Sequence, residues 1–366
     1  MSDYTGCSLQ GETMLRTIHF DHPAWTPVFV GFLPACWMKY GDELDDVLLA
    51  HPRLFPNHHR PARREPPVLE GLLAAGRVKD CWGCVWENLH PGIIGQVVEH
   101  PLADWGAWDS WTPPDPLRDN LLGPRDWDRT AREIREKKVR GDFSMDFILP
   151  HGFHFLLMCD LRGFENVMID MIEPPPEFDR LIDIMLRFDS AVADKFIELG
   201  TEFMGLAEDL GHQTGLPISL ELWRKYVKPA YEVTAGKARD RGIPVFLHSD
   251  GHILPIIPEL IETGVTVINP QLRPNGLQGL KDAVEGRMTI CLDLDRQLYP
   301  FAKPGELAEL VRQAHDTLGM PEGGLIFNLE ISEDIPLANM HELFGAIETV
   351  CNLPDPETTG HASVGA

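Results

Sequence analysis

Residues 243–270, IPVFLHSDGHILPIIPELIETGVTVINP, contain the pattern that decides the fold. Two short apolar runs, 243–250 and 265–270, flank a helical stretch that ends at Gly264. Short apolar strands separated by a helix are typical of a parallel sheet that helices cover. The segment therefore predicts one strand–helix–strand unit of an α/β protein.

The same alternation continues on both sides of this segment. Further strands are expected at 202–209, 288–295 and 324–330, each followed by a helix, and a long amphipathic helix is expected at 174–200. At least five such units in a row favour a (β/α)8 TIM barrel. The alternative is a doubly wound open sheet, but such a sheet usually carries a Gly-rich phosphate loop, and this sequence shows none.

The first third of the chain differs from the rest in amino-acid composition. Residues 1–130 are rich in Pro, Trp and His, so we expect loops and short elements there. The run HPRLFPNHHRPARR (51–64) is interpreted as a solvated loop, or alternatively as a lid that brings an Arg to an anionic substrate. We expect one domain over 1–354 and a flexible tail over 355–366.

Composition narrows the classes of function. The formal net charge of −24 over 366 residues disfavours binding to nucleic acid or to anionic membranes. The seven cysteines are odd in number and lack the spacing of a disulfide scaffold, which favours reduced thiols in a cytoplasmic protein. Neither a signal peptide nor an apolar run long enough for a membrane helix is evident.

Some short motifs are interpreted as structural. Cys81 and Cys84 have the spacing of a redox pair, but WENLHPG, which follows, is a poor helix start, so a redox site is disfavoured. The two His of HGFHF (151–155) are expected to pack in the core or a cleft wall, and Cys291 in the core.

Polar residues stand at the carboxyl ends of five successive predicted strands, which is where barrel enzymes build their active sites. They are Glu208, Asp209, His248, Asp250, Asn269, Asp293, Asp295 and Glu330. Successive strand residues point to opposite faces, so His248 and Asp250 project the same way. Such a pair can bind a metal ion, or it can act as an acid–base pair in which the carboxylate orients the imidazole.

Several segments together resemble the uroporphyrinogen decarboxylase-like (URO-D) superfamily. They are DCWGCVWENLHPGIIGQVVEHPLADW (80–105), LRGFENVMIDMIEPPPEF (161–178), AEDLGHQTGLPISLELWRKYVKPAY (207–231), VFLHSDGHILPIIPELIETGVTVINPQ (245–271), and LDLDRQ with KPGELAELVR (292–312). The resemblance implies a TIM barrel with one deep cleft. It also implies one of two chemistries, namely decarboxylation of uroporphyrinogen or methyl transfer linked to cobalamin.

The methyltransferase branch is the closer match. True decarboxylases carry substrate-binding arginines near the N-terminus, whereas PVFVGFLPACWMKYGDEL (27–44) has none. Methyltransferases of the superfamily carry a zinc-binding His-x-Cys, where this chain has His248-Ser249-Asp250, and a later Cys or His, where it has Leu329 beside Glu330. A zinc site rich in thiolates is therefore not expected. The resemblance leaves two alternatives, which are a zinc site of His248 and Asp250 with Glu208 or Glu330, and a site without a metal.

In this interpretation the chain moves a methyl group from a small methoxylated or methylated substrate to a corrinoid (cobalamin) on a partner protein. Catalytic roles are expected for His248, Asp250 and Glu208, and substrate-binding roles for Asp209, His212, Asn269, Asp295, Trp82 and Trp86. The protein is expected to be a monomer or a homodimer. The alternatives are a decarboxylase or lyase acting on a carboxylated small molecule, and a non-catalytic corrinoid- or tetrapyrrole-binding protein.

Overall fold

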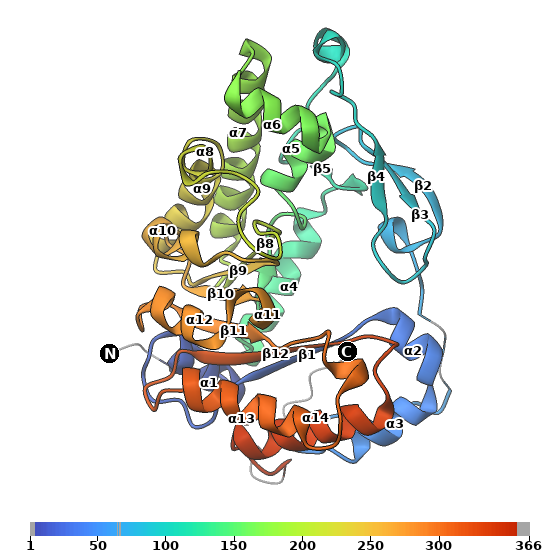
Figure 1. Ribbon diagram of the computed structural model, residues 1–366, viewed down its shortest axis with the longest axis vertical. Coiled ribbons are helices and arrows are strands. Elements are labelled where there is room, and N and C mark those ends of the chain that lie inside the picture. Colours follow the sequence, from blue (N-terminus) through green and yellow to red (C-terminus); the bar gives the residue numbers. More distant parts are fainter. Residues whose placement is uncertain (1–3, 64, 66, 357–366) are drawn as a thin grey trace. The chain divides into compact units, whose positions relative to one another are not determined.

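The computed structural model describes residues 4–63, 65 and 67–356. The chain divides into two compact units (Figure 1). The first unit comprises Met1–Val68, Lys138–Phe143 and Asn269–Ala366, and the second comprises Leu69–Lys137 and Ser144–Ile268. Two of the sequence positions at which the chain passes from one unit to the other fall within regular elements. One lies in helix α4 (Trp127–Arg140) and the other in strand β10 (Val267–Pro270).

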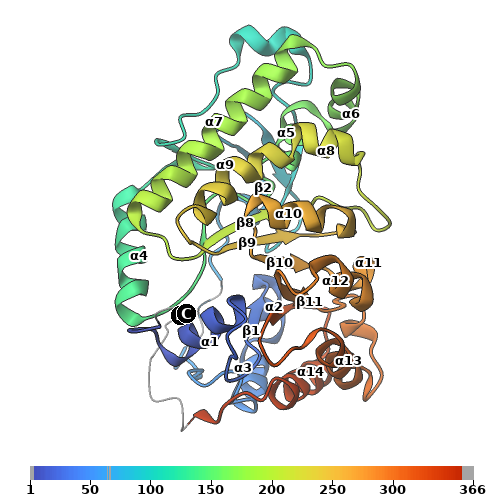
Figure 2. The same ribbon diagram turned by 90° about the vertical axis from the view of Figure 1, so that its left-hand side faces the viewer.

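Parallel strands followed by helices form the second unit. Its parallel strands pair in the order β7 (Asp146–Phe147), β8 (Met204–Glu208) and β9 (Val245–Ser249). Its helices are α5 (Phe155–Arg162), α6 (Phe164–Ile172), α7 (Pro176–Leu199), α8 (Leu220–Tyr226), α9 (Lys228–Arg239) and α10 (Ile257–Thr263), with the 3-10 turns η1 (Gly71–Leu73), η2 (Trp105–Ser110) and η3 (Leu254–Ile256). Figure 2 shows α9 running beside α7, with which it packs.

Small antiparallel sheets make up the early part of the second unit. Strands β2 (Gly76–Lys79), β3 (Val85–Asn88) and β4 (Gln96–Glu99) form one sheet, and β5 (Asp119–Asn120) pairs with β6 (Gly123–Pro124). These strands are four residues long or shorter. This part of the chain therefore has the loop-rich character that its Pro and Trp content predicts.

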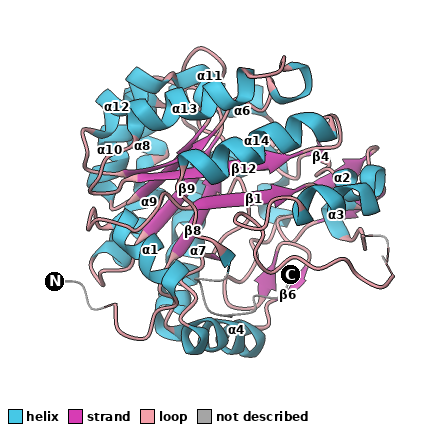
Figure 3. Ribbon diagram, turned by 90° about the horizontal axis from the view of Figure 1, so that it is seen from below, coloured by secondary structure: helices cyan, strands magenta, loops and turns pink. Residues whose placement is uncertain are grey.

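The first unit contains parallel strands in the order β1 (Val28–Phe32), β12 (Leu325–Ile331) and β11 (Thr289–Asp293). Its helices are α1 (Leu9–Ile18), α2 (Pro34–Tyr40), α3 (Asp42–Leu49), α11 (Leu272–Asn275), α12 (Leu277–Val284), α13 (Glu306–Leu318) and α14 (Leu337–Val350), with the 3-10 turn η4 (Tyr299–Phe301). Helix α14 packs on this sheet (Figure 3), where Phe344 meets Phe32 edge-on at 6.3 Å between ring centroids.

The ends of the long helix α7 follow from its sequence. Pro176 stands in its first turn, where its missing N–H costs nothing, and Glu177 and Asp179 complement the positive end of the helix dipole. Gly200 ends the helix in the left-handed conformation at φ 87°, which a glycine adopts without steric cost. The predicted helix over 174–200 is thus confirmed.

The predicted strands at 202–209, 243–250, 265–270, 288–295 and 324–330 all form. Strand β1 was not predicted, because its residues stand in a Pro-rich stretch that we interpreted as loop. Most of the predicted tail, residues 357–366, lies outside the described residues, and the prediction of one domain over 1–354 stays a prediction. Within the described part of the chain, no helix is long and apolar enough to cross a membrane.

Candidate functional site

The carboxyl ends of β8 and β9 bring two acidic residues together. These strands pair in parallel, with Glu208 opposite Ser249, so Asp209 and Asp250 each follow the end of a neighbouring strand. The backbone N–H of Asp250 donates to the Asp209 carboxylate at 3.4 Å. The two strand ends therefore form one edge, as is expected for a barrel-type enzyme site.

Close contact between the loops that follow these strands depends on two glycines. A Cβ built on Gly211 would lie 2.5 Å from the backbone nitrogen of His252, and one built on Gly251 would lie 2.0 Å from the carbonyl oxygen of Gly211. Gly251 also has φ +82°, a conformation that other residues rarely adopt. Only glycine fits at this crossing, which holds the two strand ends together.

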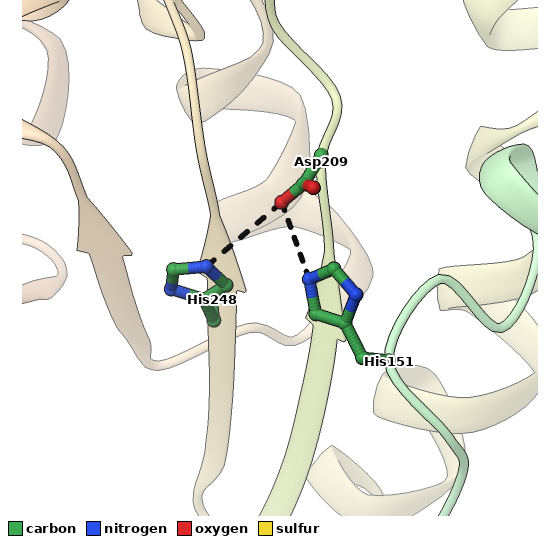
Figure 4. A group of neighbouring side chains, drawn as sticks. All are labelled: His151, Asp209 and His248. Carbon is green, nitrogen blue, oxygen red and sulfur yellow. Dashed lines mark hydrogen bonds and ion pairs between the residues drawn. The ribbon is translucent and has the colours of Figure 1, made fainter. Parts of the chain in front are cut away.

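Two histidines converge on Asp209 (Figure 4). Its Oδ1 lies 3.2 Å from Nε2 of His151 and 3.9 Å from Nε2 of His248. One ligand atom from each of the three side chains lies within 4.8 Å of the others. Two imidazoles and one carboxylate are a donor set that catalytic zinc sites use, leaving a coordination position for water or substrate. These residues therefore form a candidate metal centre.

Asp250 also contacts His248 at this centre. Its Oδ1 lies 3.3 Å from Nε2 of His248, which confirms that the two side chains project the same way. Ser249, between them, points away and is fully buried, and its hydroxyl accepts a hydrogen bond from the backbone of Leu210 at 3.0 Å. The His248–Asp250 side of the strand thus stays partly open, with 22% and 36% of the two side chains exposed.

Electrostatics keep Asp209 ionised. Burial alone would raise the pKa of its carboxyl, but the hydrogen bond and charge of His151 and the charge of His248 outweigh burial, so the pKa lies below its ordinary value. An ionised carboxylate between two imidazoles is the state that a divalent cation requires.

His151 comes from the loop between β7 and α5, and its neighbour Gly152 fixes its place. The backbone N–H of Gly152 donates to the carbonyl of Ala207 at 2.8 Å, so the loop runs beside β8. Gly152 has φ +73°, and a Cβ there would lie 2.7 Å from the side chain of Leu156. The prediction that both His of HGFHF pack in the core or a cleft wall holds for His154, which is fully buried. His151 instead faces Asp209.

Glu208 has an inward side chain, opposite to Asp209. It is fully buried, and its carboxylate accepts backbone hydrogen bonds at 2.8 Å from His154, 3.1 Å from Phe155 and 3.4 Å from Leu156. It therefore caps the N-terminus of α5, where a carboxylate complements the helix dipole. Desolvation raises the pKa of Glu208 despite these bonds. Its predicted catalytic role stays a prediction.

Three further residues of the second unit were predicted to bind the substrate, and the structure gives each of them different neighbours. Trp82 is buried and stacks on Trp111, while the half-buried Trp86 donates its indole N–H to Asp80 at 2.8 Å. His212 follows Asp209 in the same loop and meets the ring of Phe164 edge-on at 6.2 Å. Of these three, His212 is the one on the loop of the candidate metal centre.

The first unit contains the other predicted strand-end residues, which are Asn269, Asp293, Asp295 and Glu330. Asn269 is buried and donates to the Cys291 carbonyl at 2.6 Å, and Cys291 is buried as predicted. Asp295 pairs with Arg273 at 3.2 Å. Glu330, predicted as a metal ligand, pairs with Arg296, as does Asp293. Their parts in substrate or metal binding stay predictions.

The segment 51–64, interpreted as a loop or alternatively as a lid, bonds to other residues of the first unit. His51 bonds to Glu348 at 3.0 Å and His58 to Asp45 at 2.9 Å, and the Arg53 guanidinium bonds to the Leu353 carbonyl at 2.7 Å. These contacts tie the described part of the segment to its own unit. They support the interpretation as a loop.

Cys81 and Cys84 have the electrostatics of inert thiols. Burial is the main cause that raises the pKa of Cys81 to about 12 and the pKa of Cys84 further. Iodoacetamide at pH 8 should therefore alkylate Cys81 roughly 10³-fold more slowly in the folded protein than in urea, because only thiolates react. Peptide mass spectrometry over a time course measures both rates. Equal rates in the two states would show that the thiol is activated and would reopen the redox interpretation.

A comparison with sequence models of protein families identifies the family of this chain. The sequence model of uroporphyrinogen decarboxylase (URO-D) matches residues 98–350. The chain therefore belongs to the URO-D family, as the sequence resemblance indicated. A search of the curated proteins gives no match.

A solved structure shows a similar fold. A methyltransferase from Methanosarcina mazei matches with a TM-score of 0.58 and 18% sequence identity, over 93% of this chain and 98% of that one. At this identity the similarity shows the fold, and it confirms the predicted α/β, TIM-barrel-like architecture. A dihydropteroate synthase from Xanthomonas albilineans matches with a TM-score of 0.31 and 16% identity, over 45% of this chain and 62% of that one, which is too weak to bear on fold or function.

Proposed function

We propose that this chain is a methyltransferase that moves a methyl group from a small O- or N-methylated substrate to a corrinoid held by a partner protein. The observation that carries the proposal is the group His151, Asp209 and His248, whose ligand atoms lie within 4.8 Å of one another at the ends of β8 and β9. Membership of the URO-D family and a fold shared with a methyltransferase support it.

The donor set fits zinc. Two neutral imidazoles and an ionised carboxylate match the three protein ligands of catalytic zinc sites, and Asp250 stands beside the same nitrogen of His248. When bound there, zinc would supply a Lewis acid that polarises the oxygen or nitrogen carrying the methyl group. Nitrogen and oxygen donors make a harder centre than thiolates do, which favours an oxygen or nitrogen leaving group over a thiol.

The side chains of the chain have separate parts in this proposal. Asp209 orients His151 through their contact at 3.2 Å, and in the metal-free protein the two histidines outweigh burial and lower the pKa of its carboxyl, so it is ionised and ready for a cation. Asp250 orients the His248 ring or completes the ligand set. His212, on the loop after Asp209, stays our candidate for contact with the substrate.

The decarboxylase alternative has one observation in its favour, which is that the matching family model is named for a decarboxylase. Against it, the stretch 27–44 has no arginine, so it lacks the positive charges that a polycarboxylate would need there. A decarboxylase would release CO2 without a metal, and a non-catalytic protein would bind a corrinoid and turn nothing over.

A methyl-transfer assay tests the proposal. The zinc-loaded protein is mixed with free Co(I) cobalamin and either methoxylated aromatics or N-methylated small molecules, and the absorbance change to methylcobalamin is followed. We expect turnover with at least one donor class, none without protein, and none after chelation of zinc. Absence of transfer to cobalamin from both donor classes, together with release of CO2 from carboxylated donors, would replace this proposal with the decarboxylase.

A further inference from the structure

The three side chains of the candidate metal centre come from segments that are held in different ways. His248 lies in β9 and Asp209 directly follows β8, and the backbone hydrogen bonds between these paired strands fix how far apart they stand. His151 instead comes from the loop after β7, and it reaches Asp209 from that loop (Figure 4). A loop has no ladder of backbone bonds, so the place of His151 needs another support.

The buried carboxylate of Glu208 gives the segment after His151 such a support. It accepts hydrogen bonds from three successive backbone N–H groups, those of His154 at 2.8 Å, Phe155 at 3.1 Å and Leu156 at 3.4 Å. The first N–H groups of a helix have no acceptor within the helix, and the side chain of the N-cap residue of α5 does not provide one. Glu208 therefore caps α5 from a neighbouring strand, in place of a local side chain.

Further hydrogen bonds hold the same segment. The N–H of Gly152 donates to the carbonyl of Ala207 in β8 at 2.8 Å. The imidazole of His154 is fully buried, and its two nitrogens lie 3.2 Å from the Asp189 carboxylate and 3.0 Å from the last backbone carbonyl of α8. Residues 152–156 are thus fixed to the strand and to two helices, and His151 directly precedes them.

Glu208 connects two members of the candidate centre. It is the last residue of β8 and directly precedes Asp209, and successive residues of an extended chain point to opposite faces. Its backbone therefore directs Asp209 away from the core, while its own carboxylate, in the core, holds the segment that carries His151. The contact of 3.2 Å between Asp209 and His151 depends on both.

We propose that Glu208 is a positioning residue, which places His151 close enough to Asp209 for both side chains to bind one cation. The inference rests on the proposed function, because it takes these side chains as ligands of zinc. It gives Glu208 a role that acts through the backbone of another segment, and not the catalytic role predicted from the sequence. A fully buried carboxylate that three N–H groups occupy suits this role, whereas an acid or base has to reach the substrate.

A double-mutant cycle on zinc affinity tests the proposal, with a coloured zinc chelator as the competitor. Glu208→Gln keeps the shape of the side chain, but it removes the charge and turns one acceptor oxygen into a donor. We expect zinc to bind about 10–100-fold more weakly, which is the usual loss when a residue that orients a ligand is changed. In His151→Ala the same change should alter the affinity less than about twofold, because the side chain that Glu208 positions is gone. In His248→Ala the full loss should persist.

Asp170→Asn is the control for this cycle. It changes a buried carboxylate of the same unit, the partner of Arg162, so it should lower stability and leave the zinc affinity as in wild type. Wild-type zinc affinity in Glu208→Gln, or an equal loss with and without His151, would overturn the proposal. If Glu208→Gln does not fold, Glu208→Asp replaces it, since the shorter side chain draws the carboxylate back from the N–H groups and should give the same pattern.

A second measurement needs no zinc. Hydrogen exchange of the zinc-free protein, followed by mass spectrometry of its peptides, reports how firmly residues 152–156 are held. We expect exchange there to be about tenfold faster or more in Glu208→Gln, because hydrogen bonds to a charged group are lost, and to be unchanged in α9. Equal exchange of 152–156 in both proteins would contradict the positioning role. Failure of wild type to bind zinc would count against the proposed function instead, and the exchange rates would still decide the role of Glu208.

Discussion

Replacing His248 by alanine should lower the rate of methyl transfer by about 10²–10³-fold or more while the protein stays folded, because polarisation by a metal is worth several kcal/mol. His248 supplies one of the two imidazoles at the candidate centre, and its ring is partly exposed, so its removal leaves no large cavity. Steady-state rates with free cobalamin measure the loss, and circular dichroism checks the fold.

His90→Ala provides the matched control for this variant. His90 is an exposed histidine of the same unit, and its backbone N–H donates to Asn88. Since its side chain belongs to no site described above, the rate should equal that of wild type. Wild-type activity in His248→Ala would show that the site lies elsewhere.

Replacing Arg162 by alanine should destabilise the second unit by about 3–5 kcal/mol, because it removes one partner of a buried ion pair. The Arg162 guanidinium bonds to Asp170 at 2.8 Å with both side chains less than 10% exposed. It also donates to the carbonyls of Leu102 and Ala103 and lies 4.0 Å from the centre of the Trp105 ring. Its loss would leave the Asp170 carboxylate buried without its cation.

Urea unfolding curves followed by tryptophan fluorescence measure this change. Arg129→Ala is the control, since Arg129 forms an exposed pair with Glu133 one turn away on α4 and should leave the midpoint nearly unchanged. Equal midpoints for Arg162→Ala and Arg129→Ala would mean that the buried pair contributes nothing to stability.

Much of the fold could be predicted because it depends on local patterns. Apolar runs of five or so residues that alternate with amphipathic helices identify β8 to β12 and their helices. Strand β1 was missed because VFVGF is a brief run between Pro27 and Pro34, where short-range signals favour loops.

The candidate site was predicted in part. His248 and Asp250 could be paired from strand alternation alone, and the structure confirms that their side chains meet. Alternation also requires Glu208 and Asp209 to point to opposite faces, but the sequence does not say which one faces the core. The sequence does not indicate His151, because the strand before it, β7, is only two residues long and too short to show a strand period.

Zinc content of the purified protein, measured by elemental mass spectrometry beside His151→Ala, tests the central claim most directly. His151 is the residue that the structure adds to the predicted pair, so its variant tests the geometry as well as the chemistry. We predict about one zinc per chain in wild type and a loss of at least nine-tenths of it in the variant. Absence of zinc from wild type prepared with zinc present, or equal zinc in both proteins, would contradict the account and leave His248 and Asp250 as an acid–base pair.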